Sequence, residues 1–430
     1  MERKISHKLL EWKNSSDRMP LIVTGARQVG KTYSLLEFGK LHYQNVVYLN
    51  FENNADLCAV FERDLKPARI IRELSVISGE SIFEKDTLLI FDEIQACEKA
   101  LTSLKYFCEE TPDYHIAAAG SLLGVTLNRS KFSFPVGKIN KITLYPLDFE
   151  EFLMASDKQN GLNMICECFE NNAFFPAHNE YLDAYKIFLL VGGMPFVVSE
   201  YLKNKDFIQV YNLQKTINDA YISDMVKYAQ ATETNRILAA FNSIPAQLAK
   251  ENRKFQYKII KTGARAYEFE NSLEWLQTAG IVRKSVKITE GKFPLELFAL
   301  HNSFKIYLSD TGLLSSKYNL AHNVILSDLS GIENIKGALA ENYVFSTLVT
   351  NGYTPFYWES EGKAEVDFVI QNRDGKIIPV EVKSSEHNRS KSLQQFVNKY
   401  KPDYSIRIST KNFGFENGIK SIPLYAVFCI

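Results

Sequence analysis

Eight residues near the start of the chain have the types and the spacing of a phosphate-binding loop. They follow an apolar run, precede a stretch typical of a helix, and read Gly25, Ala26, Arg27, Gln28, Val29, Gly30, Lys31 and Thr32. This order fits G-x-x-x-x-G-K-[ST], in which backbone N–H groups surround a phosphate at a helix N-terminus. We predict that Lys31 contacts the β- and γ-phosphates of ATP and that the Thr32 hydroxyl binds Mg²⁺. An ordinary turn with the same letters is the competing interpretation.

A second motif places two carboxylates at the end of an apolar run. Residues 88–91 are typical of a strand buried on both faces of a parallel sheet, and Asp92 and Glu93 follow directly. Open α/β sheets bind their ligands at the carboxyl ends of the strands. We predict that Asp92 holds the same Mg²⁺ and that Glu93 is the general base for the attacking water. A solvated strand end would also explain the pair, but the phosphate loop favours an ATP site.

Both motifs need a sheet to position them, and the pattern of the surrounding residues predicts one. Apolar segments at residues 45–51, 115–121 and 142–144 alternate with segments of helical periodicity. This alternation favours an α/β fold with a doubly wound parallel sheet. Ser121 ends one of these strands, where a polar side chain would sense the γ-phosphate. Capping of the helix that follows is an equally good interpretation of Ser121.

Another group of charged residues lies near the C-terminus. Residues 365–385 predict two strands joined by a tight turn. By the two-residue period of a strand, Glu381 and Lys383 share one sheet face, which Asp367 can also reach. Asp367 and Glu381 would hold a Mg²⁺ for attack on a phosphodiester, and Lys383 would position or activate the water. Glu341, on a preceding helix, would support the metal. A cross-strand salt bridge on a solvated face explains the same pattern.

The middle of the chain changes in pattern. Helices followed by short strands across residues 216–320 favour a winged-helix domain. Basic side chains gather in it, at Lys250, Arg253, Lys254, Lys258, Lys261 and Arg265. Phe255 and Tyr257 are interleaved with them. This combination predicts a surface for the phosphate backbone of DNA, with a solvated helical face as the alternative.

Composition restricts the wider possibilities. Fifty basic residues balance fifty acidic ones, so nucleic-acid binding would need a local patch and not the charge of the whole chain. The six cysteines are scattered, and Cys166 and Cys168 lack a second pair that would complete a zinc site. We therefore expect reduced thiols and a cytoplasmic protein. No apolar run is long enough to cross a bilayer, so we expect no membrane partner.

Several motifs in a fixed order resemble a known family over essentially the whole chain. They lie at residues 25–32, 91–95, 119–124, 134–138, 192–195, 307–314, 365–368 and 379–383. The chain resembles the prokaryotic predicted ATPases of the AAA superfamily that carry a C-terminal domain of uncharacterised function. The resemblance implies a P-loop ATPase core at 1–150, a helical lid at 151–215, a winged-helix-like domain at 216–320 and a PD-(D/E)xK nuclease-like, restriction-endonuclease-like α/β domain at 321–430.

The resemblance also implies roles for individual residues. ATP binding would fall to Gly30, Lys31 and Thr32, and hydrolysis to Asp92 and Glu93. The nuclease-like signature would fall to Glu341, Asp367, Glu381 and Lys383. Many relatives have an arginine where this chain has Lys138, and Arg129 is a candidate substitute for that missing guanidinium.

Two functions follow from these observations. The first is a Mg²⁺-dependent ATPase that acts on DNA, with or without cleavage by the C-terminal domain. The second is a nucleotide-gated binding module for a protein partner, similar to STAND-type ATPases, with slow turnover and no nuclease activity. Assembly into a homo-oligomer is compatible with either, because AAA-type cores often complete their site from a neighbour.

Overall fold

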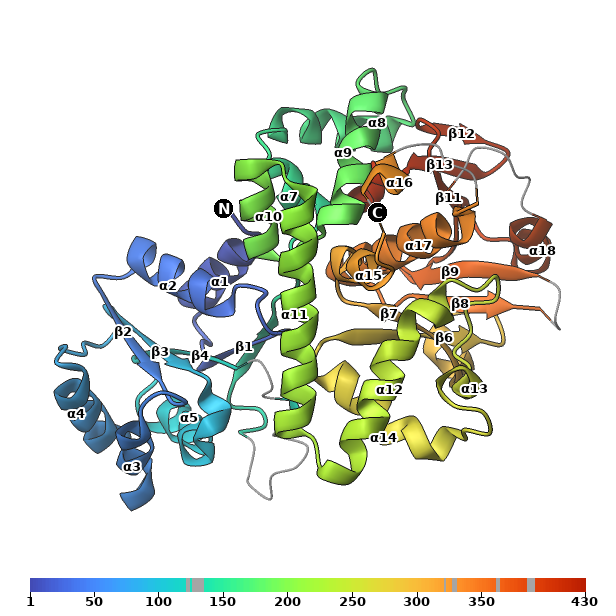
Figure 1. The fold of residues 1–430 in the computed structure, drawn as a ribbon. Coiled ribbons are helices and arrows are strands. Elements are labelled where there is room, and N and C mark those ends of the chain that lie inside the picture. Colours follow the sequence, from blue (N-terminus) through green and yellow to red (C-terminus); the bar gives the residue numbers. More distant parts are fainter. Residues whose placement is uncertain (121–123, 126–134, 321, 327–330, 361–363, 385–390) are drawn as a thin grey trace. The chain divides into compact units, whose positions relative to one another are not determined.

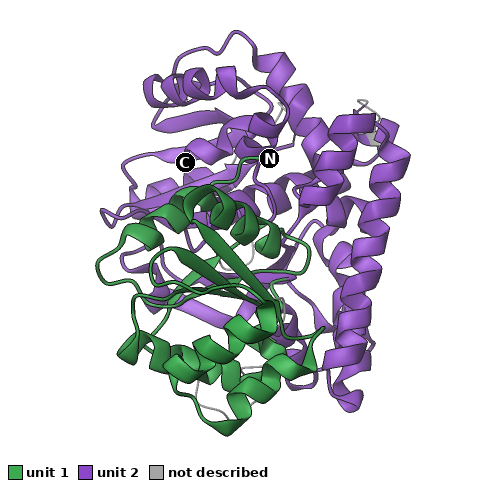
Figure 2. Ribbon diagram, turned by 90° about the vertical axis from the view of Figure 1, so that its left-hand side faces the viewer, with its two compact units in different colours: residues 1–145, 278–280 green, residues 146–277, 281–430 purple. Residues whose placement is uncertain are grey.

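The fold was analysed in a computed structural model. It describes residues 1–430 except 121–123, 126–134, 321, 327–330, 361–363 and 385–390. The chain divides into two compact units, coloured separately in Figure 2. Unit 1 comprises residues 1–145 with 278–280, and unit 2 comprises residues 146–277 with 281–430.

Unit 1 is built on a parallel sheet with helices on both faces (Figure 1). Its strands are β1 (Leu21–Thr24), β2 (Asn45–Asn50), β3 (Thr87–Asp92), β4 (His115–Ala119) and β5 (Asn140–Thr143). Its helices include α1 (Ile5–Asn14), α2 (Lys31–His42), α3 (Ala55–Arg63), α4 (Pro67–Ser78), η1 (Ile94–Ala96) and α5 (Glu98–Glu110). The strand order is β2-β3-β4-β1-β5, and the pairings are parallel. The predicted α/β fold with a parallel P-loop-type sheet is therefore confirmed.

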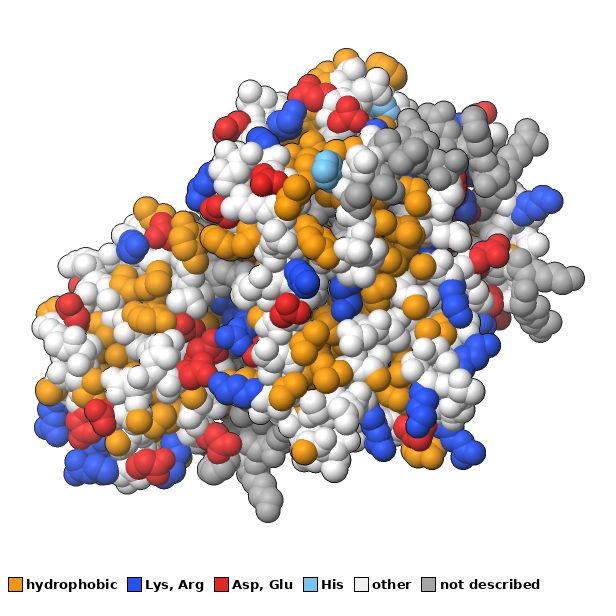
Figure 3. Space-filling view, viewed as in Figure 1, with side chains coloured by type: hydrophobic (Ala, Val, Ile, Leu, Met, Phe, Trp, Pro, Cys, Tyr) orange, Lys and Arg blue, Asp and Glu red, His pale blue; other side chains and the backbone are white. Residues whose placement is uncertain are grey.

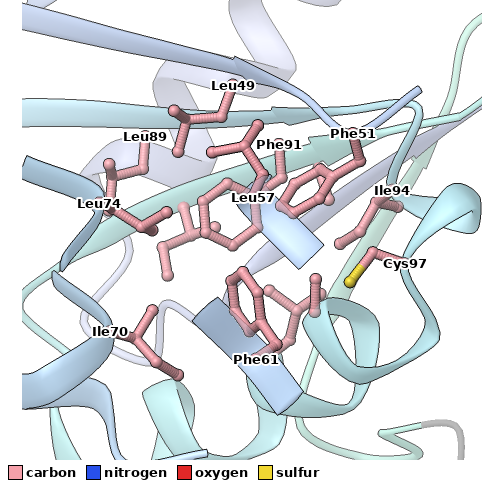
Figure 4. Packing of buried hydrophobic residues seen from close by; sticks show 14 of the residues in the cluster. Leu49, Phe51, Leu57, Phe61, Ile70, Leu74, Leu89, Phe91, Ile94 and Cys97 are labelled. Carbon is pink, nitrogen blue, oxygen red and sulfur yellow. The ribbon is translucent and has the colours of Figure 1, made fainter. Parts of the chain in front are cut away.

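The central strands of this sheet are buried, and an apolar cluster packs against them. All residues of β3 and β4 are buried, as expected for central strands that are covered on both sides. Phe61 of α3 and Leu74 of α4 pack with Phe91 of β3 in the cluster drawn in Figure 4. Aromatic contacts within this cluster include Phe51 against Phe91, with ring centroids 5.4 Å apart. This packing fixes the end of β3, and therefore the carboxylate that follows its apolar run.

Unit 2 begins with helices, which agrees with the helical middle predicted from the sequence. They are α7 (Phe149–Ala155), η2 (Gln159–Gly161), α8 (Leu162–Asn171), α9 (His178–Val191), α10 (Pro195–Asn204), α11 (Phe207–Tyr228), α12 (Ala231–Leu248), α13 (Tyr257–Ile260) and α14 (Ala266–Thr278). Later helices are η3 (Leu295–Phe298), α15 (Thr311–Lys317), α16 (His322–Leu326), α17 (Glu333–Thr350), α18 (Lys391–Tyr400) and η4 (Leu424–Cys429).

The strands of unit 2 form one mixed sheet. They are β6 (Val282–Ile288), β7 (Ala299–Leu308), β8 (Phe356–Glu359), β9 (Glu365–Gln371), β10 (Ile377–Val382), β11 (Ser405–Ser409), β12 (Gly414–Glu416) and β13 (Ile419–Pro423). The order is β12-β13-β11-β10-β9-β8-β6-β7, drawn in yellow to red in Figure 1. The β6–β7 hairpin, assigned from the sequence to a winged helix, thus pairs through β8 with the C-terminal strands. The boundary expected at residue 320 separates strands of one sheet.

Two glycine-containing motifs of the sequence meet at a buried joint in unit 2. The Asp310 carboxylate accepts hydrogen bonds from the backbone N–H of Gly193, at 2.6 Å, and of Leu313, at 2.8 Å. Gly192 has a φ of 70°, and a side chain on Gly193 would collide with the backbone of Leu147. These motifs therefore join the start of α10 to the start of α15. Glycine is required at position 193 because the backbone of Leu147 approaches it closely.

Candidate functional site

The predicted phosphate loop connects β1 to α2 in a strand–turn–helix. Gly30 has a φ of 93° and precedes the first residue of α2, and Gln28 also has a positive φ, of 66°. Gly25 has a φ of 145°, and a Cβ built on it would lie 2.1 Å from the carbonyl oxygen of Leu144. Only glycine fits at this position, so the backbone can turn its N–H groups toward a bound anion at the start of α2.

Lys31 lies at the first turn of α2 and is only 7% exposed. Its ammonium donates hydrogen bonds to the carbonyl oxygens of Gly25, at 2.9 Å, and Ala26, at 2.8 Å. Burial lowers the pKa of Lys31 to about 8, and the nearby carboxylates of Glu93 and Asp92 oppose that shift. A phosphate beside this ammonium would favour its charged form.

Thr32 and Asp92 face one another, as expected for ligands of one Mg²⁺. The Thr32 hydroxyl donates to Asp92 Oδ2 at 3.0 Å. Asp92 is 4% exposed and ends β3, which is separated from β1 by β4. A hydroxyl and a carboxylate are hard oxygen donors of the kind that Mg²⁺ prefers beside phosphate oxygens. The two residues fit the predicted metal.

A tyrosine that the sequence reasoning did not identify also contacts this carboxylate. The Tyr48 hydroxyl donates to Asp92 Oδ2 at 2.7 Å, and Asn50 Nδ2 donates to the Tyr48 hydroxyl at 3.2 Å. Both residues come from β2, whose Asn50 pairs in register with Asp92. Their polar side chains at the carboxyl end of a strand next to β3 were the available signal.

Glu93 follows Asp92 in a left-handed conformation, with φ 48° and ψ 42°. Its side chain accepts a hydrogen bond from Gln95 Nε2. Non-glycine residues in this region are strained, and such strain is common at functional sites. The turn directs the chain from β3 into η1 and leaves Glu93 at the carboxyl edge of the sheet, beside Asp92.

Other predicted residues of the ATP site have different outcomes. Ser121 and Arg129 lie outside the described residues. Lys138 forms an ion pair with Glu109 at 3.1 Å, and both side chains are partly exposed. The assignments of individual residues to binding and hydrolysis stay predictions.

The four predicted residues of the C-terminal site lie in one region of unit 2. Asp367 of β9 accepts a hydrogen bond from the backbone N–H of Val382 at 2.8 Å. Lys383 contacts Glu381 Oε1 at 3.0 Å, as the strand period predicted. Burial, followed by the charge of Glu341, raises the pKa of Asp367 to about 7.

The C-terminal site also contains cations that the sequence reasoning did not place there. Lys305 of β7 contacts Glu341 Oε1 at 3.0 Å, and Arg253 contacts Glu341 Oε2. Within the described ranges, no group of three or more histidine, cysteine, aspartate or glutamate side chains has a geometry that would hold a metal ion. Lys305 is far from the motif in sequence and carries no local signal for this role.

Only part of the basic segment predicted to bind DNA is exposed. Arg253 contacts Glu341, and Lys254 contacts Glu359, so both cations are engaged within unit 2. Phe255 stacks on Phe304 at 5.2 Å, and Tyr257 packs edge-on against Phe255. The remaining basic side chains are exposed, at Lys250, Lys258, Lys261 and Arg265. Figure 3 shows basic and acidic side chains interspersed on the face that it draws.

Comparisons with known families identify the first part of the chain. Residues 17–153 match the family model described as AAA domain. The parallel sheet and the phosphate loop lie within this match. Residues 182–323 and 336–427 match two families described as domains of unknown function, DUF8612 and DUF4143. The AAA-type P-loop domain is thus supported by sequence and by geometry, and the nuclease-like character of the C-terminal part has no such support.

Individual relatives are distant. An uncharacterised protein of Methanocaldococcus jannaschii is 23% identical over 258 residues, or 57% of this chain and 52% of that protein. The chain therefore spans about half the length of this curated relative.

In the part of the chain that the structure describes, no helix has both the length and the apolar character needed to cross a membrane.

Two solved structures illustrate the likeness of this chain to known folds. A Walker-type ATPase of Pyrococcus abyssi has a TM-score of 0.46 at 16% identity, covering 74% of this chain and 95% of that chain. The Aeropyrum pernix ORC1 protein in complex with DNA has a TM-score of 0.30 at 13% identity, covering 74% and 91%. Because these scores are below 0.5, the assignment of unit 1 rests on its family match and its own geometry.

Proposed function

We propose that the protein binds ATP with Mg²⁺ in unit 1 and hydrolyses it. The observation that carries this proposal is the 3.0 Å contact between Thr32 of the phosphate loop and Asp92 at the end of β3. It brings the two sequence motifs to one point, with Lys31 beside them. The AAA domain match to residues 17–153 supports the same activity.

Each side chain has a distinct part in the proposed reaction. Lys31 binds the β- and γ-phosphate oxygens, and the backbone N–H groups from Gly25 to Thr32 surround them. Thr32 and Asp92 would hold Mg²⁺, which would neutralise charge on the phosphates. Glu93 takes a proton from the attacking water as general base. Tyr48 orients Asp92 through its hydrogen bond.

Phosphate release from the full chain tests this function. We expect Lys31→Ala to lose ATP binding and hydrolysis together, because it removes the phosphate-binding ammonium. Glu93→Gln should retain ATP binding and lower turnover by about 100-fold or more, because an amide cannot accept the proton. Lys40→Ala is the matched control, since Lys40 is an exposed lysine of the same helix that pairs with Glu37. Equal turnover in the wild type and Lys31→Ala would remove the proposal.

The same assay separates the two forms of the proposal. In the first form, ATP hydrolysis is coupled to DNA through the exposed basic residues of 250–265, and low-salt duplex DNA raises turnover. In the second, ATP binds tightly, is hydrolysed slowly and gates a protein partner. Stimulation by DNA that disappears with added salt would favour the first form, because phosphate contacts release counterions. Tight binding with negligible turnover, with or without DNA, would favour the second.

A further inference from the structure

Eight charged side chains of unit 2 form one compact cluster around the predicted C-terminal metal site. The acidic members are Glu341, Glu365, Asp367 and Glu381, and the basic members are Arg253, Lys305, Lys383 and Arg407. Four acidic side chains thus face four basic ones, and the raised pKa of Asp367 lowers the negative charge of the cluster further. Anionic oxygens attract a divalent cation, and this cluster has no excess of negative charge to offer one.

Glu341 has both of its oxygens engaged. Oε1 accepts from the Tyr307 hydroxyl at 2.5 Å and contacts Lys305 at 3.0 Å, while Oε2 contacts Arg253. The side chain is 1% exposed. A metal could bind Glu341 only if it displaced one of these groups, and it would then lie beside the buried cations that remain.

Lys305 is the central cation of the cluster. Its side chain is fully buried, and besides Glu341 it contacts Glu365 and lies 4.0 Å from Asp367 Oδ1. Although burial disfavours the charged form, these three carboxylates hold the pKa of Lys305 above its ordinary value. The ammonium thus supplies one positive charge among the carboxylates that were expected to receive Mg²⁺.

The remaining carboxylate is also accompanied by cations. Glu381 Oε1 contacts Lys383 at 3.0 Å, and Oε2 lies 4.0 Å from Arg407 Nε. Glu381 Oε2 has no hydrogen-bond partner among the described residues. This oxygen lies beside the Arg407 guanidinium, whose positive charge opposes the approach of a divalent cation.

We propose that this cluster is metal-free and that the Lys305 ammonium takes the place of the catalytic cation expected there. The C-terminal domain would then contain the residues of a nuclease-like signature, but it would not cleave nucleic acid with the help of a metal. This inference concerns unit 2 alone and does not depend on ATP hydrolysis in unit 1.

Titration of the nucleotide-free full chain with Mn²⁺ tests the proposal. We expect no stoichiometric Mn²⁺ site of submillimolar affinity that depends on Asp367, so that the wild type and Asp367→Asn give the same titration. Stoichiometric binding by the wild type that is lost in Asp367→Asn would overturn the proposal. Mn²⁺-dependent cleavage of nucleic acid that is lost in Asp367→Asn would overturn it as well.

Removal of the ammonium gives a second, positive test. Lys305→Met leaves the carboxylates in excess, so Mn²⁺ should bind and raise the melting temperature of this variant by about 3 °C or more at millimolar concentration. The wild type and Lys287→Met should not respond. Lys287 is a partly buried lysine of β6 that pairs with Glu359 outside the cluster. A folded Lys305→Met that gains no Mn²⁺ response would contradict the proposed role, and if this variant does not fold, the wild-type titration decides.

Discussion

At the scale of single residues, the most informative group of the candidate ATP site is Lys31. It is buried against two carbonyl oxygens, and burial lowers its pKa to about 8. A bound triphosphate would restore the charged form, because opposite charges favour ionisation. Nucleotide binding should therefore be linked to protonation of this side chain.

This linkage predicts proton uptake on binding of Mg·ATP above neutral pH. Half of the Lys31 side chains are neutral near pH 8, so binding should take up about half a proton there and close to one at pH 9. Affinity should fall as the pH rises through this range, since a growing fraction of the protein must first acquire a proton. Calorimetry in buffers of different ionisation enthalpy measures the uptake.

Lys31→Arg provides the control for proton uptake. A guanidinium stays charged at these pH values, so this variant should bind without the proton uptake, even if more weakly. The same uptake in Lys31→Arg, or none in the wild type at pH 8–9, would show that Lys31 is not the titrating group.

The sequence predicted some residues of the sites and not others, for a physical reason. The phosphate loop and Asp92 are recognisable because their chemistry depends on neighbours in the sequence. Tyr48 reaches Asp92 only through the register of β2 against β3. Lys305 reaches Glu341 only through the packing of β7 on α17, and nothing in the sequence near either residue indicates that contact.

At the scale of elements, the joint around Asp310 explains motifs that could be mistaken for a catalytic site. Its carboxylate accepts from the backbone N–H groups of Gly193 and Leu313, and it is the N-cap of α15. Burial raises the pKa of Asp310 to about 6, and the hydrogen bonds from the backbone oppose this shift. The residues around it are glycines because the backbones approach closely.

Asp310→Ala should destabilise unit 2 without a direct effect on the ATP site. It removes the cap of α15 and leaves the buried N–H of Gly193 unsatisfied, for a loss of about 2–4 kcal/mol in the free energy of unfolding. Chemical denaturation measures the loss. Asp206→Ala is a matched comparison, because Asp206 caps α11 from an exposed position and its loss should cost about 1 kcal/mol. Equal losses in the two variants would contradict the proposed joint.

Elements with strong local patterns were predicted well. The apolar runs of β3 and β4 agree with the sequence-based expectations. Helix α3 was not predicted, although Leu57, Val60 and Phe61 give it a helical spacing. The pairing of β6 with β8 could not be predicted, because parallel pairing between distant strands has no short-range signal.

At the scale of the whole molecule, charge gives little guidance to the partner. Fifty basic and fifty acidic residues leave no net field, and part of the basic segment is engaged inside unit 2. The central claim is therefore the one that the geometry of unit 1 supports, namely that the phosphate loop and Asp92 hold one Mg·ATP. Calorimetric titration of the full chain with ATP, once in the presence of Mg²⁺ and once in EDTA, tests this claim most directly.

We predict saturable heat with Mg²⁺, and affinity weaker by about tenfold or more either in EDTA or in Asp92→Asn, because both remove the Mg²⁺ link between the phosphates and the Asp92 carboxylate. Absence of binding heat with Mg²⁺, or an affinity that neither EDTA nor Asp92→Asn changes, would contradict the account.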